Sequence, residues 1–339
     1  KDNQIRRLEA ISADVSAGAF YANVTGALGY RRNRHEGKIT GLAAIGDSTN
    51  CRNLIRRHFG LDDTLRFTRT VTQHRDKFKE RINMFKHFFR GKFEYIDSYY
   101  NSMKNDITLS KFSDQDIAAA TQDTLENAVT IMIEDCMDRY EMCNLALAGG
   151  VFSNVKLNQR ISELRTVENI FVHPNMGDGG GAYGAAMLAF TRTSKIKPPK
   201  IEDVFWGPDY SDENIKTVLE EHGYKAKYIR NIEETIADLL AKGMIVGRFN
   251  GKMEYGPRAL GNRSILVEPS RLETNNELNE RLGRTEFMPF APVVMKEHGA
   301  DLFWRFNETL DTSKYMTITL DVRKEWIDRI AAVVHTDNT

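Results

Sequence analysis

The sequence has no net charge and no long hydrophobic run, and each absence argues against a class of protein. Its 339 residues carry 47 basic and 47 acidic side chains, which argues against binding nucleic acid through bulk electrostatic attraction. No apolar run reaches the ~18 residues that a membrane helix needs, and the first residues show no signal-peptide pattern. We therefore expect a cytoplasmic protein without a nucleic-acid or membrane partner.

Cysteine is also scarce. Cys51, Cys136 and Cys143 are the only three, and no pair has the CxxC spacing typical of metal or redox sites. An odd number without that spacing indicates reduced, mostly structural thiols. The sequence opens at Lys1 rather than at a methionine and stops at "VVHTDNT", so we expect a fragment of a longer protein.

Hydrophobic residues make up 41% and charged residues 28% of the chain, which is an ordinary globular composition. Its length favours two domains. Strands and helices alternate from residue 143: strand "CNLALAGG", helix "VFSNVKLNQRISEL", strand "NIFVHP" and helix "GAYGAAMLAFTRT". This order predicts a largely parallel sheet. Residues 194–203 ("SKIKPPKIED") read as a linker, because a proline pair cannot continue a helix.

The regions on either side of this block have weaker patterns. Helices are predicted over 16–30 and from Ser113, which is a good N-cap. We interpret residues 50–110 as a lid insertion, and the basic, aromatic stretch 67–95 within it as a solvated helix face rather than a nucleic-acid surface. Beyond residue 203 a second α/β unit is predicted, with helices over 212–222, 232–242 and 272–282 and strands over 224–229, 244–249, 264–269 and 290–295.

The first candidate motif is "LALAGGVFSNVKLN". Gly149 and Gly150 lie where a strand becomes a helix, so a ligand could approach the backbone there. The start of the helix offers free N–H groups to a phosphate, and Asn154 could reach the same ligand. Because short glycine motifs are weak signals, a plain strand-to-helix turn is the alternative.

A second motif, "HPNMGDGGGAYGAAM", places Asp178 between a strand end and a glycine-rich helix start. Such a carboxylate could hold a metal, or a ribose or phosphate through a metal. It could equally be an N-cap. His173 lies nearby, and a lone histidine is more often structural.

The third motif, "YGPRALGNRS", concentrates donors in one turn. Arg258 and Arg263 flank Asn262, and two guanidinium groups together suit a doubly charged oxyanion such as phosphate. The turn leaves one predicted strand and enters another, at a sheet edge where α/β sites usually lie. Arg284, in "NERLGRTEFMPFAP", could wall the same site. The alternative is a surface loop whose arginines pair with Glu254 or Glu268.

Four segments of the chain occur in this order: "EGKITGLA", "LALAGGVFSNVKLN", "GDGGGAYGAA" and "GRFNGKMEYGPRALGNRSIL". In these segments the chain resembles the O-carbamoyltransferases of the nodulation-protein and antibiotic-tailoring type. The resemblance implies two α/β modules. Residues 1–193 would have the actin-like, Hsp70-like ATPase fold, incomplete at its N-terminus. Residues 204–339 would resemble threonylcarbamoyl-adenylate synthase, truncated at its C-terminus. The second module would make carbamoyl-adenylate from ATP and carbamoyl phosphate, and the first would move the carbamoyl group to a hydroxyl of a sugar or natural product.

The resemblance also implies roles for single residues. Arg258 and Arg263 would grip the phosphate of carbamoyl phosphate or of the nucleotide. Gly149, Gly150 and Asn154 would form the nucleotide loop, with Glu36 and Lys38 of the "EGK" segment beside it. Asp178 would help to bind a divalent iron, Fe(II).

The sequence departs from the family's pattern at three places. The family's iron site also uses two histidines four apart, and none of the eight histidines has that spacing. Leu282 and Met288 stand where basic residues are expected. The family's "HxDGTARPQ" segment is present only as "HTDNT" (335–339).

Two other functions stay open at this stage. One is a small-molecule kinase or ATPase of the actin-like superfamily, which would need no second module. The other is a non-catalytic nucleotide-binding module. The expected partner is a small molecule whose hydroxyl accepts the carbamoyl group. The expectations also include a homodimer.

Overall fold

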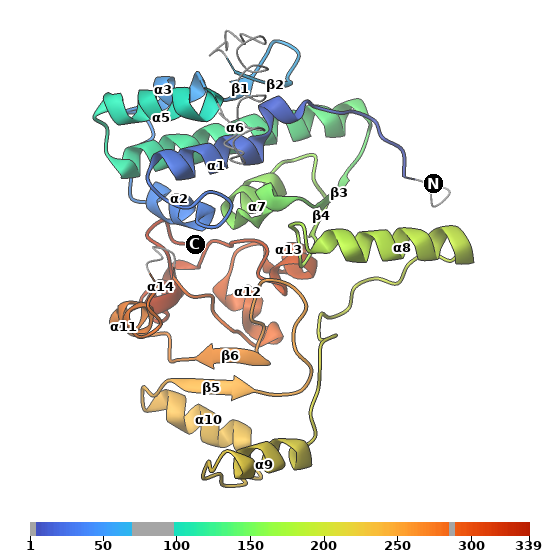
Figure 1. Ribbon diagram of the computed structural model, residues 1–339, viewed down its shortest axis with the longest axis vertical. Coiled ribbons are helices and arrows are strands. Elements are labelled where there is room, and N and C mark those ends of the chain that lie inside the picture. The colour runs from blue at the N-terminus through green and yellow to red at the C-terminus, as the bar shows by residue number, and fades with distance from the viewer. Residues whose placement is uncertain (1–4, 70–97, 285–288) are drawn as a thin grey trace, which may run out of the picture. The chain divides into compact units, whose positions relative to one another are not determined.

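The computed structural model describes residues 5–69, 98–284 and 289–339, and its secondary structure is mixed α/β with small sheets (Figure 1). Its contacts divide the chain into two compact units. The helical unit contains Arg7–Met142, and the sheet unit contains Cys143–Thr285 and Pro289–Thr339.

The helical unit is built around α6 (Asp114–Arg139). The Ser113 hydroxyl accepts a hydrogen bond from the Asp116 N–H at 3.1 Å, which confirms the predicted N-cap. The predicted helix over 16–30 is present as α1 (Ala17–Ala27). A core of apolar side chains joins these helices, and within it the rings of Phe20 and Phe59 stack 4.7 Å apart. The other helices in the described part of this unit are α2 (Glu36–Ala43), α3 (Arg52–Arg56) and α5 (Ser98–Ser110), with a short η1 (Ala13–Val15).

The predicted lid over 50–110 falls only partly within the described residues. That part contains α3, α5 and a small antiparallel pair, β1 (Gly60–Leu61) with β2 (Phe67–Thr68). Residues 70–97 lie outside the described residues, and so does most of the basic, aromatic stretch. The lid interpretation therefore stays a prediction.

The sheet unit begins with the predicted β-α-β arrangement. Strand β3 (Asn144–Leu147) runs parallel to β4 (Asn169–Val172), in a register from Asn144↔Asn169 to Leu147↔Val172. Between them lie η2 (Gly150–Ser153) and α7 (Val155–Ser162), whose Leu157 and Ile161 are buried. Helix α8 (Gly180–Ser194) follows β4. The sequence predicts a largely parallel sheet, and parallel pairing is confirmed for these two strands.

The predicted linker 194–203 is attached along its course to α13 (Phe306–Ser313) and the residues that follow it. The Lys200 ammonium contacts the Asp311 carboxylate at 2.5 Å, and the Tyr315 hydroxyl donates to the Ile201 carbonyl at 2.9 Å. Burial, with nearby carboxylates, raises the pKa of Tyr315 to about 12. The compact units divide between Met142 and Cys143 rather than near residue 193, and the assignment of two modules stays a prediction.

A second sheet follows, and its pairing differs from the first. Strand β5 (Val246–Phe249) is antiparallel to β6 (Arg263–Leu266). The two sheets share no strand, as predicted (Figure 1). The predicted strands over 224–229 and 290–295 are wrong. Tyr228 there is 80% exposed and Val293 82% exposed, so their side chains pack against no neighbouring layer in the described part of the chain.

The remaining elements of the sheet unit are mostly short. They are α9 (Asp212–Glu221), α10 (Ile232–Ala241), α11 (Glu273–Arg281), η3 (Lys296–His298), α12 (Gly299–Leu302), α14 (Lys324–Ile327) and η4 (Ala331–Val333). The helices predicted over 212–222, 232–242 and 272–282 are thereby confirmed. A small apolar core of Leu302, Val322 and Ile330 joins the later elements.

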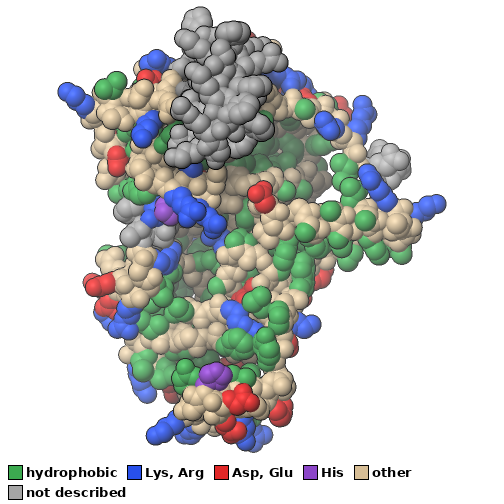
Figure 2. All heavy atoms as spheres, viewed as in Figure 1, with side chains coloured by type: hydrophobic (Ala, Val, Ile, Leu, Met, Phe, Trp, Pro, Cys, Tyr) green, Lys and Arg blue, Asp and Glu red, His purple; other side chains and the backbone are tan. Residues whose placement is uncertain are grey.

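Basic and acidic side chains are interspersed over the face shown in Figure 2, in keeping with the balanced charge of the chain. Among the described helices, none has the length and apolar character to cross a membrane.

Candidate functional site

The carboxyl ends of β3 and β4 are tied together by a glycine. Gly149 has φ 120° and ψ 152°, a conformation that only glycine adopts readily. Its N–H donates to the Met176 carbonyl at 2.6 Å, which links the loop after β3 to the loop after β4. A Cβ added at Gly149 or at Gly150 would meet no atom within 4 Å. The backbone is therefore open to a ligand at the sheet edge where α/β proteins usually bind one.

Asn154 has a local role at the end of this loop. Its side-chain oxygen accepts a hydrogen bond from the Leu157 N–H at 3.0 Å and so caps α7. The cap fixes the start of the helix behind the glycines.

The loop after β4 is tightly packed where it enters α8. A Cβ added at Gly180 would lie 2.2 Å from the Asn175 carbonyl oxygen, so the backbone needs glycine there. The Nδ1 atom of His173 lies 2.9 Å from the same oxygen. The other ring nitrogen, Nε2, is buried without a hydrogen-bond partner among the described residues. Asp178 lies on this loop with an exposed side chain.

The turn formed by the motif "YGPRALGNRS", which we call the arginine turn, is organised by a buried carboxylate. One oxygen of Glu254 accepts hydrogen bonds from the backbone N–H groups of Leu260 at 2.9 Å, Asn262 at 2.7 Å and Arg263 at 3.1 Å. Burial on its own would raise the pKa of Glu254, but these N–H donors outweigh burial and lower it. Sequence reasoning named Glu254 only as an ion-pair partner for the arginines, whereas it binds the backbone of the turn.

The two arginines of the turn have different environments. The Arg263 guanidinium donates to the carbonyls of Asn250 at 2.8 Å and Gly251 at 3.0 Å, and lies 3.6 Å above the Phe249 ring. Asn262 is similarly occupied, because its amide donates to the Lys252 carbonyl at 2.7 Å. These contacts attach Arg263 and Asn262 to the backbone of the turn, and their predicted catalytic roles stay predictions.

Arg258 is the available cation of the turn. It is largely buried, and burial lowers the pKa of its guanidinium. Its Nε is buried without a hydrogen-bond partner, and no acidic side chain in the described residues pairs with the group. A buried cation without a partner is costly. An anion bound at this position would remove that cost.

The arginine turn lies against the loop after β4. A Cβ added at Gly256 would lie 3.1 Å from the Pro174 carbonyl oxygen, and the Tyr255 hydroxyl donates to the Gly179 carbonyl at 3.3 Å. The structure thus brings together the second and third sequence motifs.

An aromatic cluster that sequence reasoning missed lies at this junction. The Trp206 ring stacks on those of Tyr255 at 5.0 Å and Tyr183 at 5.4 Å between centroids, and is 45% exposed. Its position follows from backbone pairing, because the Tyr255 N–H donates to the Val204 carbonyl at 2.7 Å. The three rings are far apart in the sequence, so no local pattern signals them.

A separate hollow of about 320 Å³ lies beside α11. Its lining includes Arg271 and Glu277, which pair at 3.3 Å. Because its charges are compensated in this way, it is a weaker anion site than the surroundings of Arg258.

Replacing Glu254 by glutamine should destabilise the sheet unit by about 1–3 kcal/mol, because a charged acceptor of three buried N–H groups is lost. Urea unfolding of the variant measures this change. Glu268→Gln is the matched control, since Glu268 accepts one N–H, from Ser270, in an exposed turn. Equal losses in the two variants would show that Glu254 does not organise the arginine turn.

The Glu254 contribution also has a predictable pH dependence. Its pKa is lower in the folded chain, so the stabilisation is complete above the unfolded-state pKa of about 4.3. It is lost as the pH falls through the lower folded-state pKa. The stability difference between the native protein and Glu254→Gln should therefore be constant between about pH 6 and 8 and shrink in acid.

Comparison with known families adds to this geometry. The family described as "Carbamoyltransferase N-terminus" matches residues 1–187, and the family described as "Carbamoyltransferase C-terminus" matches residues 237–339. The chain belongs to the carbamoyltransferase family. The loop after β3 that contains Gly149 and Gly150, which we call the glycine loop, lies in the first matched region, as does the loop after β4. The arginine turn lies in the second.

Relatives of this member of the carbamoyltransferase family match it over nearly its whole length. An uncharacterized protein of Methanocaldococcus jannaschii is 32% identical over 98% of this chain and 52% of its own. Nodulation protein NolO of Bradyrhizobium diazoefficiens is 28% identical over 99% of this chain and 58% of its own. Nodulation protein NolNO of Sinorhizobium fredii is 28% identical over 99% and 47%. The chain thus spans about half the length of the curated relatives it matches.

Three other predicted residues have local contacts. Glu36 and Lys38 are on α2 of the helical unit, where Glu36 accepts the Asn33 N–H at 2.5 Å and the Lys38 ammonium lies 5.5 Å from the Tyr30 ring centre. The Arg284 guanidinium lies 4.5 Å from the Phe290 ring centre. Their roles in the candidate site stay predictions.

The described residues do not fit the iron that the family resemblance implies. No group of three or more histidine, cysteine, aspartate or glutamate side chains in them could hold a metal ion. Asp178 is one exposed carboxylate, and divalent metals need several ligands. Asp178 therefore remains a single candidate ligand, and no catalytic step is assigned to a metal here.

Proposed function

We propose that this chain contributes to an ATP-dependent O-carbamoyltransferase. Water would release phosphate from carbamoyl phosphate, and the resulting carbamate would displace pyrophosphate from ATP to give carbamoyl-adenylate. A hydroxyl of a sugar or natural product would then take the carbamoyl group and release AMP. The observation that carries the proposal is Arg258, whose Nε is buried without a hydrogen-bond partner among the described residues, in a turn fixed by Glu254. Membership of the carbamoyltransferase family supports the same chemistry.

The two parts of the site would divide the work. Arg258 would hold the phosphate of carbamoyl phosphate or of the nucleotide, since arginine offers a fork of donors to an oxyanion. The open backbone at Gly149 and Gly150 would receive the nucleotide phosphates. Adenylation requires that phosphate charges be clamped and aligned, and transfer to a neutral hydroxyl depends mainly on positioning.

The proposal also assigns each of the two sheets to a module with a specific fold. The parallel pair β3–β4, with α7 between the strands, is compatible with part of an actin-like ATPase module. The sheet of β5 and β6 would belong to a module like threonylcarbamoyl-adenylate synthase. A kinase of the actin-like superfamily would need no such second module, so the match of residues 237–339 favours the carbamoyltransferase.

The labelled products of ATP test this function. The full-length protein would be incubated with ATP labelled at the α-phosphate, with and without carbamoyl phosphate. Adenylation should give a labelled AMP-containing product only when carbamoyl phosphate is present. A kinase would instead give labelled ADP whether or not carbamoyl phosphate is added, and a non-catalytic module would bind ATP without turnover. Either result would refute the proposal.

A further inference from the structure

Helix α7, which follows the glycine loop, is held by residues more than 150 positions later in the chain. The Asn158 amide is fully buried and donates to the carbonyls of Phe152 and Thr317, both at 2.7 Å. The Gln159 amide donates to the Asp321 carboxylate at 2.8 Å and accepts from the Thr319 hydroxyl at 2.8 Å. The interior face of α7 is therefore anchored in the second matched region of the chain.

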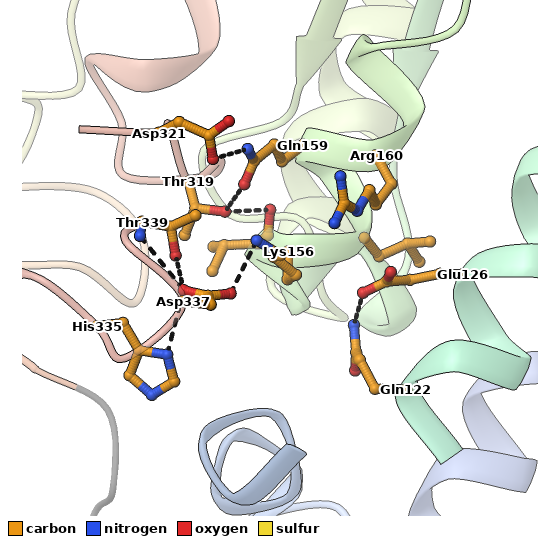
Figure 3. Close-up of polar contacts among 12 residues, drawn as sticks. Gln122, Glu126, Lys156, Gln159, Arg160, Thr319, Asp321, His335, Asp337 and Thr339 are labelled. Carbon is orange, nitrogen blue, oxygen red and sulfur yellow. Dashed lines mark hydrogen bonds and ion pairs between the residues drawn. The ribbon is translucent and has the colours of Figure 1, made fainter. Parts of the chain in front are cut away.

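An ion pair extends this attachment to the first turn of α7. The Lys156 ammonium lies 2.8 Å from the Asp337 carboxylate, which also accepts the Thr339 hydroxyl at 2.7 Å (Figure 3). His335 Nδ1 lies 3.4 Å from the same carboxylate. The Lys156 and Asp337 side chains are only 15% and 30% exposed. This pair is therefore screened less by solvent than a surface ion pair.

The position of Lys156 makes this pairing informative. A lysine in the first turn of a helix opposes the helix dipole and is unfavourable there without an anion. Asp337 supplies that anion from residues 335–339, which we call the 335–339 turn. We propose that Asp337 is a positioning residue: it fixes Lys156 and the first turn of α7, and through them the glycine loop at Gly149.

Hydrogen exchange tests the positioning directly. In Asp337→Asn and in Lys156→Met, backbone amides of residues 149–158 should exchange about tenfold faster than in the native protein. The double variant should exchange no faster than either single variant, because both changes break the same link. Asp311→Asn is the matched control, since it removes a lysine–aspartate pair of the same unit that does not touch α7. Unchanged exchange in Asp337→Asn would overturn the inference.

A second measurement separates positioning from mere stability, and it rests on the proposed function. In the full-length protein, Asp337→Asn should weaken ATP binding by about tenfold, whereas Lys156→Arg should retain binding because it keeps the ion pair. Faster exchange combined with native ATP affinity would show that the pair is structural only, and would refute the positioning role. If the native protein bound no ATP, the proposed function would fail, and the exchange result would still decide whether Asp337 orders the glycine loop.

Discussion

Replacing Gly149 by valine is expected to lower ATP-dependent carbamoyl transfer by the full-length protein about 100-fold or more. The φ of 120° at this residue lies in a region that L-residues with a side chain avoid, at a cost of about 1–3 kcal/mol. A valine would also fill the open space over the backbone, where a phosphate would lose charge-assisted contacts of about 1.5–3 kcal/mol. Because 1.4 kcal/mol is about a factor of ten, the lower ends of the two ranges together correspond to about 60-fold, and the upper ends to far more than 100-fold.

A control variant is needed to separate the effect of backbone strain at Gly149 from the loss of phosphate contacts with the backbone. Gly223 offers a control, because it has φ 69° and an added Cβ there would also meet nothing within 4 Å. Gly223→Val should reduce stability and leave turnover close to native. If Gly149→Val retained as much transfer activity as Gly223→Val, the glycine loop would not be part of the site.

The parallel part of the fold could be predicted because its signals are local. "CNLALAGG", the amphipathic pattern of α7 and "NIFVHP" follow one another within 32 residues, and the order strand–helix–strand fixes a parallel pair. The pairing of β5 with β6 could not be read in the same way. The two strands are separated by the arginine turn rather than by a helix, and a return over that distance permits an antiparallel pair.

The two wrong strands show the limit of an apolar pattern. "FAPVVM" and the residues 224–229 are apolar enough to predict strands, but a strand also needs a partner to accept its backbone hydrogen bonds. The described residues provide none, and side chains such as Val293 are exposed. Pairing partners depend on tertiary structure, which a local window does not contain.

The sequence predicts which loops lie at strand ends but not the contacts that the side chains in those loops make. The sequence places Gly149, the loop with Asp178 and the arginine turn at strand ends, which the structure confirms for the strands β3, β4, β5 and β6. The sequence does not indicate which of the two arginines faces a ligand. Arg263 donates to backbone carbonyls, and those acceptors become available only when the chain folds.

Replacing Arg258 by alanine should weaken carbamoyl phosphate binding roughly ten- to hundredfold, since one charge-assisted contact is worth about 1.5–3 kcal/mol. Arg258→Lys should restore only part of the affinity, because an ammonium cannot replace a bidentate fork. Isothermal calorimetry with the full-length protein measures both. Transfer from chemically supplied carbamoyl-adenylate should be affected much less, since it bypasses the adenylation step.

Arg263→Ala is the matched comparison, and stability distinguishes the two arginines. Arg263 donates to backbone carbonyls and stacks on Phe249, so its loss should destabilise the sheet unit by about 1–3 kcal/mol. Arg258 has a buried, unpartnered Nε, so removing it should leave the free energy of unfolding unchanged or slightly higher. If Arg258→Ala destabilised the protein as much as Arg263→Ala, or impaired both transfer routes equally, Arg258 would belong to folding or to the transfer step. The assignment of the arginine turn to carbamoyl phosphate would then be wrong.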